Sequence, residues 1–288
     1  MSEQPIEIKP KFGPVTINVI ALWRWFKQRS KTDRVSLAAQ RFLELFEAHG
    51  IAATQIQHFL PQLTFDKVKS PESLLPSLTN TVLDQTAKLF SIRREWLEGL
   101  DVRIYEQQWC YKQSERFFDV LKNIKHDSST LPIRALCSVS KLDIEKGRPQ
   151  EIALVFVERI RNLGEEQINR YIIWEDEWDW GYWKTRIQLK AMVRVVQKVI
   201  GRIVPLYLVD QQTIHLMRSG HLFPHKYVEG RHLFDVSLED YSLTEAESAV
   251  AKECEELPAV LEYMKAHRLP TSLDEIFRPE SELKPRTT

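Results

Sequence analysis

Residues 89–99, LFSIRREWLEG, form the end of a helical unit in the first third of the chain. The stretch before them, TNTVLDQTAKLF, repeats buried-type residues at spacings of three and four, namely Val82, Leu83, Thr86, Ala87 and Phe90. This spacing predicts a helix over 79–91. Trp96 and Leu97 predict one more helical turn over 93–98 that closes against it. Gly99 suits the end of that turn, because glycine readily adopts the left-handed conformation found after helices.

Three more helices are expected upstream of this pair. Residues 37–49 carry apolar side chains near one face and end at Gly50, a natural helix terminator. Residues 52–60 form a shorter helix that Pro61 ends, and residues 64–70 form a third, flanked by prolines. Together they predict a compact five-helix unit. Before it, we expect an extended arm over 1–14 and a helix near 17–28.

The five-helix unit resembles the helix-turn-helix family of the XRE or Cro/C1-repressor type over about residues 36–99. The specific part of the resemblance is an alanine and apolar residues on the fourth helix followed by a W-L-x-G turn. The matching residues here are Ala87, Leu89, Phe90, Ile92, Trp96, Leu97 and Gly99. In this family the third helix lies in the major groove of double-stranded DNA.

The resemblance implies DNA contacts at the starts of the second and third helices. It places Thr54 and Gln55 near the phosphate backbone, and it places Thr64, Lys67 and Lys69 at the groove. A basic strip before the unit, together with Arg93 at the last turn, adds further candidates for phosphate contact, the strip being Arg24, Lys27, Arg29 and Lys31. The same basic strip is also typical of a helix C-terminus, where cations suit the helix dipole.

The sequence departs from the family pattern at the third helix. The stretch PQLTFDKVKSPESLL is poor in the Arg, Asn and Gln side chains that read base edges, and Asp66 would repel phosphate. Two hypotheses therefore stay open. The first is a DNA-binding transcriptional regulator with a C-terminal sensing or dimerisation domain, which the sequence favours. The alternative is a protein–protein adaptor whose helix-turn-helix-like bundle does not bind DNA.

After Gly99 the pattern predicts a second domain, of α+β class, over residues 101–235. Strands are expected at 101–112, 131–143, 150–160, 168–174, 203–210 and 212–219, with helices at 114–127 and 182–201. Short connections favour a mostly antiparallel sheet with helices on one face, a PAS-like or profilin-like layout. Such a domain would sense a signal or form a dimer. Residues 236–288 are expected to be an acidic helical extension, with Pro258 breaking the helix and a loose tail from Pro270.

Residues 174–183, WEDEWDWGYW, have the most unusual composition in the chain. The aromatic members, as a candidate ligand or partner surface, are Trp174, Trp178, Trp180, Tyr182 and Trp183. Their rings and the acids between them could form a cage for a cationic ligand. The favoured interpretation is instead structural, in which the rings fill the seam between the sheet and the following helix.

Composition excludes several other classes of function. Lys plus Arg and Asp plus Glu both number 40, so no overall basic excess indicates nucleic acid. Cys110, Cys137 and Cys254 are too few and too far apart for a disulfide framework or a zinc site, which predicts a reducing, cytoplasmic setting. Pro224 makes a metal-binding helix over His221 and His225 implausible.

No signature of an enzyme is present in the sequence. Nucleophile elbows and phosphate-cradling loops are missing, and only nine glycines are available to build such loops. We therefore predict a protein that is not an enzyme and uses no cofactor and no metal. The N-terminus lacks a signal-peptide pattern, and Asn18 and Arg24 interrupt its apolar run, so no membrane partner is expected. The regulator hypothesis implies a homodimer on double-stranded DNA and a small-molecule or protein signal.

Overall fold

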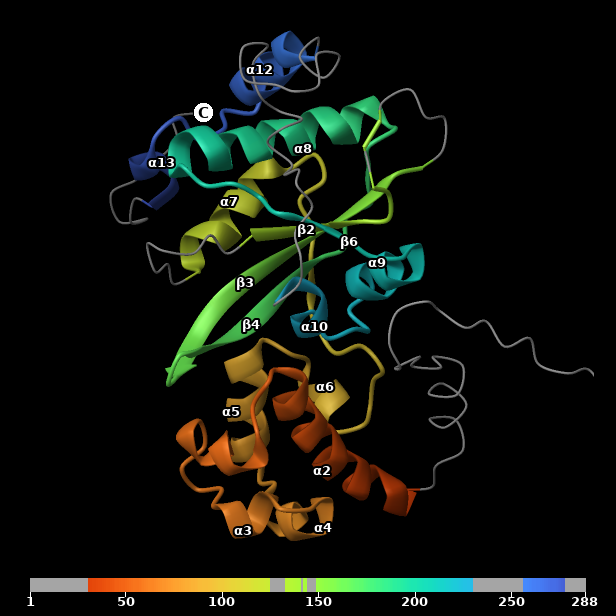
Figure 1. Cartoon of the computed structure of the whole chain (residues 1–288), viewed down its shortest axis with the longest axis vertical. Coiled ribbons are helices and arrows are strands. Elements are labelled where there is room, and N and C mark those ends of the chain that lie inside the picture. The colour runs from red at the N-terminus through yellow and green to blue at the C-terminus, as the bar shows by residue number, and fades with distance from the viewer. Residues whose placement is uncertain (1–30, 125–132, 141, 144–148, 230–255, 278–288) are drawn as a thin grey trace, which may run out of the picture.

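The computed structural model describes residues 31–124, 133–140, 142–143, 149–229 and 256–277. A helical bundle occupies one end of the molecule, a twisted sheet lies in the middle, and further helices cover the opposite side of the sheet (Figure 1). The predicted helix at 17–28, the arm before it, and Cys254 lie outside the described residues.

The bundle, residues 31–100, is built from short helices that follow one another closely. They are α2 (Lys31–Ala48), η1 (Ala53–His58), α3 (Phe65–Val68), α4 (Pro71–Leu74), η2 (Leu75–Ser77), α5 (Asn80–Phe90) and α6 (Arg94–Leu97). The predicted helix over 79–91 and the closing turn are confirmed as α5 and α6, and Trp96 and Leu97 are buried. The Thr79 side chain begins α5 by accepting a hydrogen bond from the Val82 amide.

The rest of the bundle differs from the sequence prediction in three ways. Helix α2 starts at Lys31, several residues earlier than expected. The second predicted helix is a 3-10 helix of six residues, η1. The third is reduced to four residues, because Pro71 restricts the chain at Ser70 to an extended conformation and Ser70 then begins α4 as its N-cap.

A mixed six-stranded sheet forms the centre of the molecule, in the order β1-β4-β3-β2-β6 with β5 also paired to β3. Its strands are β1 (Gln107–Gln108), β2 (Ile133–Cys137), β3 (Glu151–Leu163), β4 (Glu166–Trp174), β5 (Trp178–Asp179) and β6 (Leu206–Leu208). Pairs β2–β3, β3–β4 and β3–β5 are antiparallel, whereas the outer pairs β1–β4 and β2–β6 are parallel. Three of the five strand pairs, including the two longest, are thus antiparallel as predicted, and the two short parallel pairs make the sheet mixed.

Helices cover both faces of the sheet, so the expectation of helices on one face was wrong. One face carries a group that also includes the C-terminal helices, namely α7 (Ser114–Asn123), α8 (Trp183–Val195), α12 (Leu257–Ala266) and α13 (Leu273–Phe277). The bundle packs on the other face beside α9 (Gln211–Arg218) and α10 (His225–Val228). The physical reason is visible in β3, where residues 152–158 are all buried. Such a continuous run is typical of a strand covered on both sides.

Two further predictions were wrong. The expected strand over 212–219 is helix α9, because the Asp210 carboxylate caps it by accepting from the Thr213 amide, and Ile214 and Met217 then bury one helical face. The tail after Pro270 is not loose over its first part. There α13 forms, and Leu269 and Ile276 join the core beneath α7 and α8.

Residues on either side of the expected domain boundary at residue 100 share one hydrophobic core. Phe90 and Trp96 of the bundle belong to the same cluster as Val155 and Tyr171 of the sheet. The backbone continues this contact, since Ile92 forms a bridge with Tyr105 and the Arg93 amide donates to the Ile104 carbonyl at 2.8 Å.

Among the helices in the described ranges, none is long and apolar enough to cross a bilayer.

Candidate functional site

Helix α3 occupies the position at which the helix-turn-helix resemblance places a DNA-reading helix. Its most exposed large side chain is Phe65, at 52% of full exposure. The Thr64 hydroxyl is held by the Asp66 carboxylate, and the Lys67 ammonium donates to the Gln62 carbonyl at 2.9 Å. This surface therefore presents an aromatic ring and a carboxylate, not a row of groups that reach base edges.

The other predicted DNA contacts are scattered. Thr54 and Lys69 are exposed, but the Gln55 side chain is used within η1, where it accepts from the Ala52 amide at 2.8 Å. Lys31 begins α2, and its side chain is not described. The remaining members of the basic strip lie outside the described residues, namely Arg24, Lys27 and Arg29.

Arg93 lies among three carboxylates, which compete for its charge. Its guanidinium reaches Asp101 at 3.1 Å, Glu106 at 2.9 Å and Glu95 at 3.7 Å. Arg94 is engaged in the same way by Asp84 and Glu98. The last turn of the bundle is thus an ion-pair network with more acids than bases, which does not favour contact with phosphate.

Arg41 is a buried cation that no sequence pattern predicted. Its side chain lies over the Trp96 ring, with 5.1 Å from the guanidinium carbon to the ring centroid, and donates to the carbonyls of Trp96 and Asp101. Burial lowers the pKa of Arg41 to about 10. Arg41 thereby ties α2 to the closing turn from inside the bundle. Nothing in the spacing of Arg41 distinguishes it from a surface arginine.

Three of the five aromatic residues proposed as a ligand surface are buried. Trp174, Trp178 and Trp180 are at most 1% exposed, so they cannot form a surface cage, and the seam interpretation is confirmed for them. The cation beside the Trp180 ring is the chain's own Lys190, whose ammonium lies 5.1 Å from the ring centroid. Only Tyr182 and Trp183 remain exposed.

The acids in the same stretch also serve the fold. Asp176 accepts hydrogen bonds from the amides of Cys110 and Tyr111, both at 2.9 Å, and so holds the segment after β1 against β4. Burial raises the pKa of Asp176 in spite of these bonds. Burial also raises the pKa of the Cys110 thiol, which leaves it protonated and unreactive.

A polar network lies where the bundle meets the sheet. We call it the junction network, and its members are His49, Tyr105, Tyr171, His225 and Glu229. His49 Nδ1 is 2.7 Å from the Leu45 carbonyl and must donate to it, which leaves Nε2 to accept from the Tyr105 hydroxyl at 3.4 Å. The Tyr171 hydroxyl lies 2.9 Å from His225 Nδ1 and 3.5 Å from Glu229 Oε1.

Burial governs the protonation of the junction network. It lowers the pKa of His49 to about 4 and raises the pKa values of Tyr105 and Tyr171. His49 is therefore neutral, and both hydroxyls keep their protons. The close fit depends on Gly50, whose φ of +75° ends α2 and where a Cβ atom would lie 3.3 Å from His225 Nε2.

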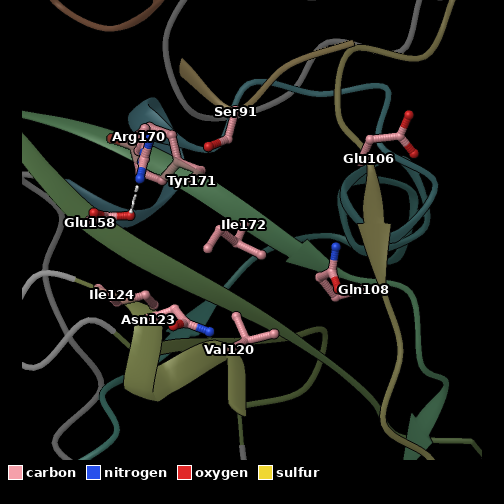
Figure 2. Close-up of a pocket in the computed structure, with 10 residues that line it drawn as sticks. All are labelled: Ser91, Glu106, Gln108, Val120, Asn123, Ile124, Glu158, Arg170, Tyr171 and Ile172. Carbon is pink, nitrogen blue, oxygen red and sulfur yellow. Dashed lines mark hydrogen bonds and ion pairs between the residues drawn. The ribbon is translucent and has the colours of Figure 1, made fainter. Parts of the chain in front are cut away.

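A cavity of about 280 Å³ opens beside the same junction, on the outer side of β4. We call it the junction cavity (Figure 2). Ser91 from the end of α5 and Glu106 and Gln108 at β1 line one side, and Val120, Asn123 and Ile124 at α7 line the other. The floor is β4, where Arg170 is paired with Glu158 of β3 at 2.7 Å. No sequence pattern predicted this cavity, because its lining residues come from five separate segments.

No metal or family assignment follows from these features. Within the described ranges, no group of three or more His, Cys, Asp or Glu residues is placed to hold a metal ion. His221 contacts the Ser219 hydroxyl, and His225 contacts the Tyr171 hydroxyl. Comparisons with models of protein families, with curated proteins and with solved structures found no match to this chain.

Proposed function

We propose that this protein is an interaction adaptor whose helix-turn-helix-like bundle binds another protein through the surface of α3. The observation that carries the proposal is Phe65, half exposed at the centre of the surface that a DNA-reading helix would use. An exposed aromatic ring beside a carboxylate suits a protein partner, because aromatic side chains are common anchors in protein interfaces. A phosphate backbone offers such a ring nothing to bind.

The charge distribution in the bundle supports the same conclusion. Arg41 is buried, and Arg93 and Arg94 are paired with the bundle's own acids. Lys67 is partly engaged as well, by the Gln62 carbonyl. Release of counterions from phosphates by lysine and arginine supplies most of the affinity of non-specific DNA binding, so arginines that are occupied in this way contribute little of that affinity.

The sheet domain would hold the bundle in a fixed orientation for its partner. The shared core and the junction network support this role, since they attach the bundle through both apolar packing and hydrogen bonds. Dimer formation and signal sensing stay predictions.

Cross-linking at position 65 tests the adaptor proposal directly. A photoreactive phenylalanine analogue replaces Phe65 in the full chain, and the matched control carries it at Leu273, which is similarly exposed on α13. We expect irradiation in native cells to yield a protein adduct from position 65 alone. The purified partner should then bind the wild type at least tenfold more tightly than Phe65→Ala. Equal binding of that variant would contradict the proposal.

The second candidate function is a DNA-binding regulator. It is favoured by one observation, that α5 and α6 close the bundle with Trp96 and Leu97 as the family resemblance implies. Titration of a labelled random-sequence duplex from about 50 mM salt upward separates the two functions. The adaptor proposal expects no binding at the lowest salt. Tight binding that weakens with salt, and that is lost when Arg24, Lys27 and Arg29 are replaced by alanine, would favour the regulator instead.

A further inference from the structure

The junction cavity lies where helix α7 stops covering its face of the sheet. The helix ends at Asn123, and Val120 and Asn123 line one wall. The floor is formed by Ile172, which packs on the same side of the sheet as α7, and by Arg170 and Glu158, which lie opposite each other on β4 and β3. Figure 2 shows these side chains arranged around one space. The cavity is therefore a part of the sheet face that α7 leaves open.

The charged groups at the junction cavity are already paired. Arg170 contacts Glu158 through Nε and Nη2, and its Nη1 donates to the Lys88 carbonyl at 3.1 Å. Glu106 at the margin is paired with Arg93 at 2.9 Å. A charged ligand would lose its hydration and would find no unpaired opposite charge among the lining residues that the structure describes. The cavity therefore favours an uncharged ligand.

The uncharged lining residues supply both hydrogen-bonding groups and apolar surface. Within the described part of the chain, neither the Ser91 hydroxyl nor the Gln108 carboxamide makes a hydrogen bond. A carboxamide carries an N–H donor beside a C=O acceptor, so a second carboxamide matches the Gln108 side chain in both directions. Val120, Ile124 and Ile172 offer hydrocarbon surface at the same cavity. A ligand with an amide head and an apolar body would use both kinds of surface.

We propose that the junction cavity binds a small uncharged carboxamide on a compact apolar body. The ligand's amide nitrogen would donate to Gln108 Oε1, while its carbonyl oxygen would accept from Gln108 Nε2. The hydrocarbon part would lie on Val120, Ile124 and Ile172. The volume of about 280 Å³ suits a ligand smaller than a drug-sized molecule. The proposal does not depend on what the α3 surface binds, so either one can fail without the other.

Bound ligand would touch the bundle and the sheet at once. Ser91 ends α5 in the left-handed conformation, with φ of +55°, and so belongs to the bundle. Gln108 and Ile172 belong to the sheet, and Val120 belongs to α7. Because the ligand would bind the folded chain alone, occupancy should also raise the melting temperature of the whole chain.

Four probes that share one hydrocarbon framework test the choice of head group. They are hydrocinnamamide, its N,N-dimethyl derivative, hydrocinnamate and phenylpropylammonium, and binding to the full chain is followed by calorimetry and by ligand-detected NMR. We expect hydrocinnamamide to bind at millimolar concentration, and the dimethyl derivative, which has no N–H donor, to bind about tenfold more weakly. Either charged probe binding as tightly as hydrocinnamamide, or no binding of hydrocinnamamide up to about 10 mM, would overturn the proposal.

A variant of Gln108 tests the pairing of the two carboxamides. Gln108→Leu keeps a side chain of similar size and removes both hydrogen-bonding groups, and the Gln108 side chain makes no bond that the fold requires among the described residues. Hydrocinnamamide should bind this variant about tenfold more weakly, and its advantage over the dimethyl derivative should disappear. An advantage that persists in Gln108→Leu would contradict the proposed pairing.

Two further variants locate the binding. Asn123→Phe places a ring in the cavity from an exposed position on α7 and should abolish binding of hydrocinnamamide. Gln113→Phe, at an exposed position next to the start of the same helix and outside the cavity, is the matched control and should bind normally. Circular dichroism checks that both variants are folded. Binding that survives in folded Asn123→Phe would place the site elsewhere and remove the proposal.

Discussion

The two faces of the sheet are covered in different ways. On the face beneath α7 and α8, Trp174 packs its ring against Phe117 and Phe156, with centroids 5.5 and 5.1 Å away. On the face beneath the bundle, apolar packing is interrupted by the hydrogen bonds of the junction network. Apolar packing tolerates small shifts, whereas a buried hydrogen bond fixes a particular pair of atoms. The junction network therefore fixes the alignment of the bundle on its face of the sheet atom by atom.

The largest expected effect on stability comes from removing the Phe90 ring, which joins the bundle to the sheet. Phe90 is fully buried, 5.0 Å from the Phe46 ring and 4.5 Å from the His49 ring. Phe90→Ala should lower the free energy of unfolding by about 3–5 kcal/mol in urea titrations followed by circular dichroism. Because the core is shared, we expect one transition for the whole chain. A separate early unfolding transition of the bundle would contradict the shared core, because it would show that the bundle is an independent folding unit.

The next largest effect on stability comes from His49 and should depend on pH. His49 has a pKa of about 4 in the folded chain and about 6.5 when unfolded. Below pH 6.5 the unfolded chain binds the extra proton, so His49 lowers stability progressively as the pH falls from about 6.5 to about 4, by up to about 3 kcal/mol. His49→Gln should lack this component when stability is measured across that range. The exposed His58→Gln serves as the control and should keep the wild-type profile.

A smaller effect is expected on the opposite face, where α12 is held by charge. Glu256 accepts from both Arg186 and Lys190, and Lys190 is only 1% exposed. Glu256→Gln should cost about 2 kcal/mol, less than a fully buried pair, because Glu256 itself reaches solvent. Thermal unfolding measures this loss. Glu262→Gln, at an exposed position on α12, should be neutral.

The smallest effect on stability belongs to the proposed partner surface. Phe65→Ala should change the free energy of unfolding by less than about 0.5 kcal/mol, because the ring is half exposed. The same change should abolish partner binding. A large loss of stability in this variant would mean that Phe65 is part of the core, and it would remove the observation on which the adaptor proposal depends.

The sequence could predict helices with a strong period and clear ends. Helix α5 has its cap at Thr79 and its buried face at spacings of three and four, and α8 continues through η3 (Val196–Ile200) to Gly201 as expected. The strand predicted over 212–219 is helix α9, because Gln211–Arg218 is so short that its apolar residues fit both the helical and the strand period. The burial of β3 on both faces was detectable, since its run of consecutive apolar residues is itself the signal.

The candidate sites were far less predictable. Trp174 and Trp183 are the same residue type, yet one is buried and the other is 56% exposed, because the end of β4 lies under α7 and α8 begins at the surface. The junction network and the junction cavity join residues more than 50 positions apart, such as His49 and Tyr105 or Ser91 and Arg170. Without the fold, no local pattern connects such residues.

The bridge between Ile92 and Tyr105 has a consequence for how this chain could have evolved. A gene segment that recombination transfers between proteins must encode all the residues that its domain needs in order to fold. A gene segment cut at codon 100 would leave behind Ile104, which supplies the acceptor for the Arg93 amide, and Tyr171, which covers His49. A segment that ends at residue 100 does not meet this requirement, because it lacks both of these contacts.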